Sequence, residues 1–298
     1  MIQSQTLKIA GAEKLEFDES AIVVWGLPTS AGGGTGRLGA ENGPDEIRKA
    51  SQGWNTLRTS DGYQYKNSHR IIDLGNLSLN GLSGLDLVSR IERNCPDVGW
   101  SQFLMTLGGD HSVSYPVIKS IFEKTGETPG LIYFDAHPDT VDQVDGNIYS
   151  HAAVLRRLID ENLVDRERTL LIGIRVPEAE EIEYIANKNL KVITPFDIME
   201  KGIAYVWNEI QKLINGSPLY MSLDLDVLNA GEVPGVENPE PGGLSSRELL
   251  YLIEKLAPYL SSCDIVELSG DTDPAGITAK TAARLAIDIM GYKLKSMQ

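Results

Sequence analysis

Apolar residues recur along the chain in short runs rich in Val, Ile, Leu and aromatic side chains, and most runs end at turn-forming or charged residues. Such runs are typical of buried β-strands, because β-branched and aromatic side chains pack well on a pleated surface. The runs predict eight strands, at residues 21–25, 70–73, 103–107, 131–135, 169–174, 191–194, 219–224 and 264–268.

Apolar positions with helical spacing follow most of the predicted strands. Pro44 suits a first helical turn, and Ser245 stands three residues before Glu248, as in a capping box. This alternation predicts a mainly parallel sheet covered by helices on both faces. No composition break or linker divides the chain, so we expect a single domain over residues 1–298. The predicted helices are 44–51, 85–94, 113–124, 151–161, 178–187, 198–213, 245–256 and 279–294.

The predicted strand at 131–135 runs directly into Asp135, His137 and Asp139. Alternate side chains of an extended segment project in the same direction, so these three are expected to converge on one point. A strand that merely ends in a polar turn is the alternative. Burial of two carboxylates without a cation is costly, which favours a metal site.

Two other predicted strands end in similar side chains. His111 follows the strand at 103–107 after Gly108 and Gly109, and Asp224 and Asp226 close the strand at 219–224. Ligands of parallel sheets bind at the carboxyl ends of strands, so all these groups are expected at one edge. The predicted metal ligands are His111, Asp135, His137, Asp139, Asp224 and Asp226.

Four carboxylates and two imidazoles are too many for one ion and suit two divalent ions. The oxygen-rich set without thiolates favours Mn²⁺ over structural zinc. Two ions about 3.5–4 Å apart can lower the pKa of a shared water, so the sequence predicts hydrolytic chemistry with two manganese ions per chain.

Two further side chains are candidates for catalysis. Glu267 follows the last predicted strand and is either a surface acid or an acceptor for a planar cation such as guanidinium. His151 either relays a proton to a leaving amine or caps the helix that begins there. His69 stands among polar residues and is expected to be a solvated surface side chain.

The segment from Gly34 to Gly39 spells G-x-G-x-x-G. A dinucleotide site needs these glycines at a strand-to-helix turn, but here they begin nine residues after Trp25 and no helix starts at the third glycine. We therefore reject a dinucleotide cofactor and expect a mobile or tightly turned loop at the rim of the site.

The net charge of −15 disfavours nucleic acid and would attract a cationic small molecule. Cys95 and Cys263 match no Cys-x-x-Cys pattern and are expected to be free thiols in a reducing compartment, which indicates the cytoplasm. The first residues lack the pattern of a signal peptide, and no apolar run approaches the length of about 20 residues that spans a bilayer.

Several segments, taken together and in order, resemble the ureohydrolases, the family of arginases and agmatinases. The resemblance covers nearly the whole chain and implies a three-layer α/β/α fold, a binuclear manganese centre and hydrolysis of a guanidino group to an amine and urea. The matching segments are residues 43–48, 108–112, 135–139, 222–226, 241–244, 264–267 and 278–279.

The resemblance also implies individual roles. His111, Asp135, Asp139 and Asp224 would hold one ion, and Asp135, His137, Asp224 and Asp226 would hold the other, with Asp135 and Asp224 as bridges. Asp139 would orient the attacking hydroxide, Glu267 would bind the guanidinium and His151 would relay a proton. Family members are commonly trimers or hexamers, so a homo-oligomer is expected.

Agmatine, which would give putrescine and urea, is the favoured substrate, because the 140–150 loop lacks the Ser-Gly-Asn segment with which arginases hold an α-amino acid. Departures from the family pattern at Asn229, Glu237 and Ser269-Gly270 leave another guanidino compound as an alternative: 4-guanidinobutanoate, arginine or free guanidine. We expect the loops that carry these departures to face the substrate tail. Other classes remain open, namely a metal-binding homologue without turnover and a metal-dependent phosphatase or deacetylase.

Overall fold

The computed structural model describes residues 7–13, 16–17, 20–33, 39–54, 59–65, 70–98, 100 and 102–298. Its strands form one sheet in which every neighbouring pair is parallel, in the order β2-β1-β3-β8-β7-β4-β5-β6. The sheet confirms the prediction of a mainly parallel sheet of about eight strands. The strands are β1 Ile22–Leu27, β2 Ile71–Asn76, β3 Phe103–Gly108, β4 Gly130–Phe134, β5 Thr169–Ile172, β6 Lys191–Ile193, β7 Leu219–Asp224 and β8 Ser262–Val266.

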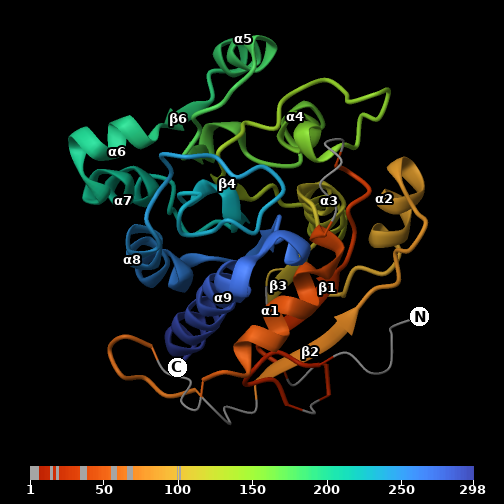
Figure 1. Ribbon diagram of the computed structural model, residues 1–298, viewed down its shortest axis with the longest axis vertical. Helices are drawn as coiled ribbons and strands as arrows, with labels where there is room; N and C mark the ends of the chain where they lie inside the picture. The colour runs from red at the N-terminus through yellow and green to blue at the C-terminus, as the bar shows by residue number, and fades with distance from the viewer. Residues whose placement is uncertain are drawn as a thin grey trace.

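Helices cover both faces of the sheet, and the fold therefore has three layers (Figure 1). One apolar core lies between the sheet and α1, α6, α7, α8 and α9, and the other lies between the sheet and α2, α3, α4 and α5. The helices are α1 Gly43–Ser51, α2 Gly84–Glu92, α3 Ser114–Thr125, α4 Val154–Asp160, α5 Ala179–Lys188, α6 Pro195–Lys201, α7 Ile203–Gln211, α8 Ser246–Leu256 and α9 Ile277–Ser296.

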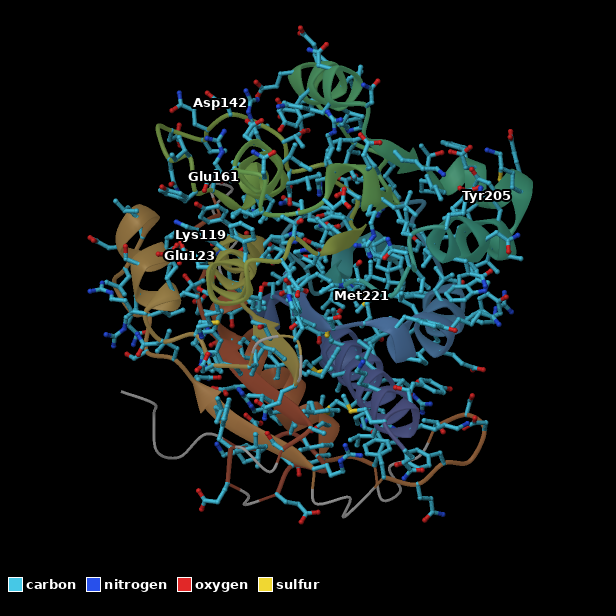
Figure 2. All side chains as sticks on the ribbon, turned by 180° about the vertical axis from the view of Figure 1, so that it is seen from behind. Lys119, Glu123, Asp142, Glu161, Tyr205 and Met221 are labelled. Atoms are coloured by element: carbon cyan, nitrogen blue, oxygen red, sulfur yellow. The ribbon has the colours of Figure 1, made fainter. Side chains whose placement is uncertain are left out.

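The central strand β7 shows why the apolar runs form buried strands. Leu219, Met221 and Leu223 join the core on one face, whereas Tyr220 joins the core on the other. Met221 lies near the middle of the molecule, and Tyr205 lies on the outer helix α7 (Figure 2). Because both faces of the sheet are covered, every residue of this strand is buried.

The prediction of one helix over residues 198–213 is wrong. Two helices, α6 and α7, meet at Gly202, which has φ 77° and ψ 160°. Glycine takes this conformation without the steric penalty of a Cβ atom, so the chain can change direction although the apolar spacing continues. The helix α6 also begins earlier than predicted, since Thr194 and Asp197 form a capping box ahead of it.

The capping box predicted at Ser245 and Glu248 is confirmed at the start of α8. In the part of the chain that the structure describes, every helix is too short or too polar to span a bilayer.

A buried ion pair fastens α1 to the edge strand β2. Arg48 Nε lies 2.9 Å from Asp73 Oδ2, Arg48 Nη2 lies 2.9 Å from Asp73 Oδ1, and both side chains are fully buried. Asp73 Oδ2 also accepts a hydrogen bond of 2.7 Å from the amide of Ile9. One carboxylate thus joins the N-terminal segment, α1 and β2.

Replacing Asp73 with Asn should destabilise the protein by about 3–5 kcal/mol, because Arg48 would keep a buried charge without its counter-ion. Urea unfolding measures this loss. The control is Glu46→Gln, which breaks an exposed pair with Lys49 at 3.3 Å and should cost less than about 1 kcal/mol. Equal losses for the two variants would contradict a stabilising role for the buried pair.

Candidate metal centre

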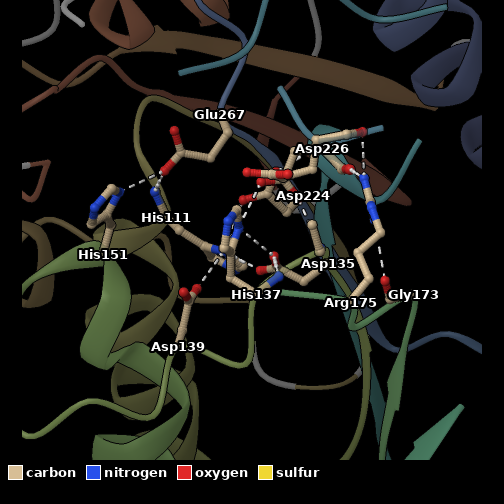
Figure 3. Close-up of polar contacts among 12 residues, drawn as sticks. His111, Asp135, His137, Asp139, His151, Gly173, Arg175, Asp224, Asp226 and Glu267 are labelled. Atoms are coloured by element: carbon tan, nitrogen blue, oxygen red, sulfur yellow. Dashed lines mark hydrogen bonds and ion pairs between the residues drawn. The ribbon is translucent and has the colours of Figure 1, made fainter. Parts of the chain in front are cut away.

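The four central strands of the sheet, in the order β3, β8, β7 and β4, bring their carboxyl ends to one place. Polar side chains follow each of these ends, and Figure 3 shows that they point toward one another. Strands that are far apart in the sequence are therefore neighbours here. The predicted site residues come from these four ends and from the loop after β4: His111, Glu267, Asp224, Asp226, Asp135, His137, Asp139 and His151.

Three carboxylates converge on one ring nitrogen. His111 Nδ1 lies 3.1 Å from Asp135 Oδ2, 3.1 Å from Asp139 Oδ2 and 3.2 Å from Asp224 Oδ2. A single ring N–H can donate to only one of the three oxygens at its best geometry. All four side chains are nearly inaccessible to solvent. The arrangement has the oxygen and nitrogen donors that a divalent cation needs.

A second group adjoins the first. His137 Nδ1 lies 2.9 Å from Asp226 Oδ2 and 3.6 Å from Asp135 Oδ1. Asp135 therefore faces both groups, with one oxygen toward each imidazole. In each of the two groups, three candidate ligand atoms lie within 4.8 Å of one another. The structure brings together all six predicted ligands, and Asp135 lies where a bridge between two ions would be.

The side chains converge by a different route from the one predicted. The strand β4 ends at Phe134, so Asp135, His137 and Asp139 lie in the turn that follows, and Asp226 lies in a 3₁₀ turn after β7. In each turn the first carboxylate accepts an amide two residues on: Asp135 Oδ1 from His137 at 2.6 Å, and Asp224 Oδ1 from Asp226 at 2.8 Å. Such turns bring i and i+2 together without an extended strand.

Two strand residues that the sequence analysis did not single out support the first group. Tyr133 donates a 2.6 Å hydrogen bond to Asp139 Oδ2, and its ring stacks on His111 at 4.9 Å between centroids. Ser222 lies 2.8 Å from His111 Nε2 and donates to Asp264 Oδ1 at 2.8 Å. Tyr133 and Ser222 each lie two positions before a predicted ligand, so strand alternation could have identified them.

Arg175 holds the second group in place from outside. Its Nη2 donates to the carbonyl oxygens of Asp226 at 2.6 Å and Glu240 at 2.9 Å, and its Nη1 donates to Gly173 at 3.1 Å. The guanidinium thus joins the end of β5, the turn with Asp226 and the loop before α8. In the sequence, this role of Arg175 is indicated only by its position directly after the predicted strand at 169–174.

The electrostatics of the site call for added positive charge. Burial raises the pKa of Asp135 to about 7, and the charges of Asp139 and Asp226 add to this effect. Burial and the charges of Asp226 and Asp135 also raise the pKa of Asp224 well above its usual value. Clustered carboxylates resist ionisation because they repel one another away from water. A pair of divalent cations would relieve this repulsion, and the donor set therefore fits such ions.

His151 and Glu267 form a separate pair beside the metal ligands. Glu267 Oε1 accepts a 2.7 Å hydrogen bond from the His111 amide and lies 3.3 Å from His151 Nδ1. Glu267 is 5% exposed, so it is not the surface acid that the sequence left open. Burial lowers the pKa of His151, but the hydrogen bond and charge of Glu267 outweigh burial and raise it to about 9. Glu267 and Asp139 both have positive φ, 66° and 51°, which is uncommon outside glycine and frequent at functional sites.

A pocket of about 350 Å³ opens onto the two groups of predicted metal ligands. Asn238, the neighbour of Glu237, lines the pocket, whereas Asn229 and Ser269 are not among its described lining residues; the orientation of the departing loops toward the substrate tail stays a prediction. Gly34–Leu38 and His69, for which the sequence predicted a rim loop and a surface side chain, lie outside the described residues. The lining residues are His137, Asp139, Val141, Val144, His151, Ala152, Val176, Glu178, Glu181, Asp224, Asp226, Asn238 and Glu267.

Comparison with known proteins identifies the family of this chain and agrees with its fold. The model of the arginase family matches residues 20–291. A mitochondrial guanidino acid hydrolase of Homo sapiens is 32% identical over 269 residues, which cover 89% of this chain and 76% of that protein. A guanidinopropionase of Pseudomonas aeruginosa is 33% identical over 265 residues, 87% of this chain and 82% of that protein.

Among solved structures, the agmatine ureohydrolase of Thermoplasma volcanium superimposes with a TM-score of 0.81 at 29% identity, covering 98% of this chain and 96% of that one. The match to the family model extends over nearly the whole sequence, and the parallel sheet with its helical layers agrees with the fold of the similar structures. This chain is therefore a hydrolase of the arginase family.

Proposed function

We propose that the protein is a binuclear manganese hydrolase that cleaves agmatine to putrescine and urea. The observation that carries the choice of substrate is the lining of the pocket. Six acids and two histidines line it, and no lysine or arginine is among its described lining residues. A pocket of this charge favours a substrate that is positive at both ends.

The six acids of the pocket fall into three sets by position. Asp139, Asp224 and Asp226 belong to the metal centre, which leaves Glu267 for the guanidinium. Glu178 and Glu181 line another part of the pocket together with Val176. These three residues belong to the segment after β5 and the start of α5. Glu178 is exposed and is assigned to the terminal ammonium of agmatine, whereas both carboxylate oxygens of Glu181 accept backbone amides, Oε1 from Thr140 and Oε2 from Glu178. A guanidino acid would instead bring its carboxylate next to these acids, where like charges repel.

The metal ligands in this proposal are the six residues of the two groups. His111, Asp139 and Asp224 would hold one ion, His137 and Asp226 would hold the other, and Asp135, which faces both imidazoles, would contribute to both. Asp224 uses Oδ1 for the amide of Asp226, so any bridging by Asp224 would fall to Oδ2. When bound, the ions supply a water molecule that is acidic enough to act as a nucleophile near neutral pH.

The remaining roles fall to three side chains of the pocket. Glu267 accepts hydrogen bonds from the guanidinium and fixes its plane. Asp139, held by Tyr133 through Oδ2, orients the attacking water toward the guanidino carbon. His151, whose pKa is raised to about 9, carries a proton at neutral pH and gives it to the leaving amine nitrogen. The bond from the guanidino carbon to that nitrogen breaks, which yields urea and the amine.

A guanidino acid such as 4-guanidinobutanoate is the second candidate substrate. The names of two similar relatives, a guanidino acid hydrolase and a guanidinopropionase, favour it. Identities near 30% leave room for a different tail pocket. Location in the cytoplasm and assembly as a trimer or hexamer stay predictions.

Replacing Asp135 with Asn should lower the manganese content of the purified protein from two ions per chain to one or fewer, because Asp135 faces both groups. Mass spectrometry of the metal after desalting measures this. Asp142→Asn serves as the control, since Asp142 lies on an outer loop away from the centre (Figure 2). Retention of both ions by the Asp135 variant would contradict the assignment of Asp135 as a shared ligand.

Replacing His151 with Asn should leave the manganese content unchanged and lower kcat by about 100- to 10,000-fold, the usual contribution of a general acid. Urea release at saturating substrate measures kcat. If kcat were retained and only KM changed, His151 would be a binding residue and not the proton donor.

A panel of agmatine, 4-guanidinobutanoate, arginine and guanidine tests the substrate. With manganese bound, kcat/KM should be highest for agmatine, because only agmatine combines a guanidinium with a free cationic tail that no carboxylate accompanies. A higher kcat/KM for 4-guanidinobutanoate would replace agmatine by the second candidate. Urea release from none of the four compounds would contradict the guanidino hydrolase itself.

A further inference from the structure

Glu237 lies beside the site, and the mechanism above gives it no role. It is 1% exposed. An antiparallel bridge joins Val236 to Leu268, and the amide of Ser269 donates to the Gly235 carbonyl at 2.9 Å. Glu237 follows this bridge on one segment and Glu267 precedes it on the other. The backbone therefore makes the two glutamates neighbours.

Glu237, Glu267 and His151 form a polar cluster next to the metal ligands. One carboxylate oxygen of each glutamate and one ring nitrogen of His151 lie within 4.8 Å of one another. Two carboxylates at this separation in the protein interior repel each other unless a cation or a proton lies between them. Burial raises the pKa of Glu237 to about 8, and the charge of Glu267 adds to this rise.

Two details indicate that this cluster is built to receive a donor. Glu267 Oε2 is buried and has no hydrogen-bond partner among the described residues, although Oε1 accepts from His111. Gly33 lies against the carboxylate of Glu237, since a Cβ atom at position 33 would be only 2.9 Å from Glu237 Oε2. The absence of a side chain at Gly33 leaves space for the carboxylate beside Glu267.

We propose that Glu237 is the second carboxylate of the guanidinium subsite and a specificity-determining residue for the cationic head of the substrate. The proposal rests on the guanidino hydrolase function proposed above. His151 must be an imidazolium to protonate the leaving amine, and the guanidinium is a second cation next to it. Glu267, which lies 3.3 Å from His151 Nδ1, balances the imidazolium, and Glu237 balances the guanidinium, so both cations can be present at the same time.

Replacing Glu237 with Gln tests this role. Loss of one charged partner should raise KM by about 10- to 100-fold, the range expected for a hydrogen bond to a charged group. Since the contact is to the head, KM should rise by the same factor for agmatine, 4-guanidinobutanoate and guanidine. The value of kcat and the content of two manganese ions should stay the same. The lost contact stabilises the bound substrate and the transition state equally, so its loss changes KM alone.

The control is Asp271→Asn, which removes an exposed acid of the loop after Glu267 and should leave KM unchanged. Glu237→Asp, which retains the charge, should recover part of the affinity. An unchanged KM in the Gln variant, or a loss of kcat or manganese with KM retained, would overturn the proposal and make Glu237 a structural residue.

Calorimetric titration of the manganese-loaded protein with guanidinium chloride gives a second measurement that needs no turnover. The dissociation constant should rise in the Glu237→Gln variant by the same factor as KM, and an unchanged constant would overturn the proposal. If the wild type prefers another substrate, the choice of agmatine fails, but the ratio between variant and wild type on that substrate still tests Glu237. If no compound is hydrolysed, the function fails and the titration still decides whether Glu237 binds the cation.

Discussion

The repulsion among buried acids is the constraint on which the rest of this structure depends. Asp135, Asp139, Asp224 and Asp226 are almost fully buried within a small volume, and the positive charge near them comes from the imidazoles of His111 and His137 and from Arg175. Burial and the charges of neighbouring acids raise the pKa of Asp135 and Asp224, and this repulsion opposes folding unless cations join the group. The chemistry that two divalent ions bring follows from the same arrangement that makes them necessary.

The parallel sheet is the means by which these acids are held together. The order β3, β8, β7, β4 brings to one edge four segments that are not all consecutive in the sequence, and β3 and β8, which pair directly, come from opposite halves of the chain. Covered faces make the strands rigid, while the turns beyond their carboxyl ends carry the polar side chains. Hydrogen bonds from Tyr133, Ser222 and Arg175 then fix the ligands and their turns. Precision at the site comes from these supports, since five of the six predicted ligands lie beyond the ends of the strands and Asp224 is the last residue of β7.

Much of the fold and of the candidate site could be predicted from the sequence. The eight strands were predictable because each is an apolar β-branched run between polar turns, and the ligand candidates because Asp and His follow those runs directly. The prediction of a single helix at 198–213 was wrong because the apolar spacing continues through Gly202, although the positive φ of Gly202 ends the helix there. The predicted mechanism of convergence was also wrong. Turns at Asp135 and Asp224, and not the alternation of side chains along a strand, bring the ligand side chains together.

Other parts of the site could not be predicted because they depend on tertiary contacts. The donors of Arg175 reach carbonyl oxygens in three segments, and no local pattern specifies these partners. The position of Glu237 beside Glu267 depends on one isolated bridge between distant loops. Its residue type was visible as a departure from the family pattern, but its place beside Glu267 and His151 was not.

The most direct test of the account is an X-ray structure of the manganese-loaded protein with anomalous data collected at the manganese edge. We expect two anomalous peaks about 3.5–4 Å apart, one next to His111 and one next to His137, with Asp135 between them. A single peak, or peaks that Asp135 does not contact, would contradict the two-ion centre on which the proposed function rests.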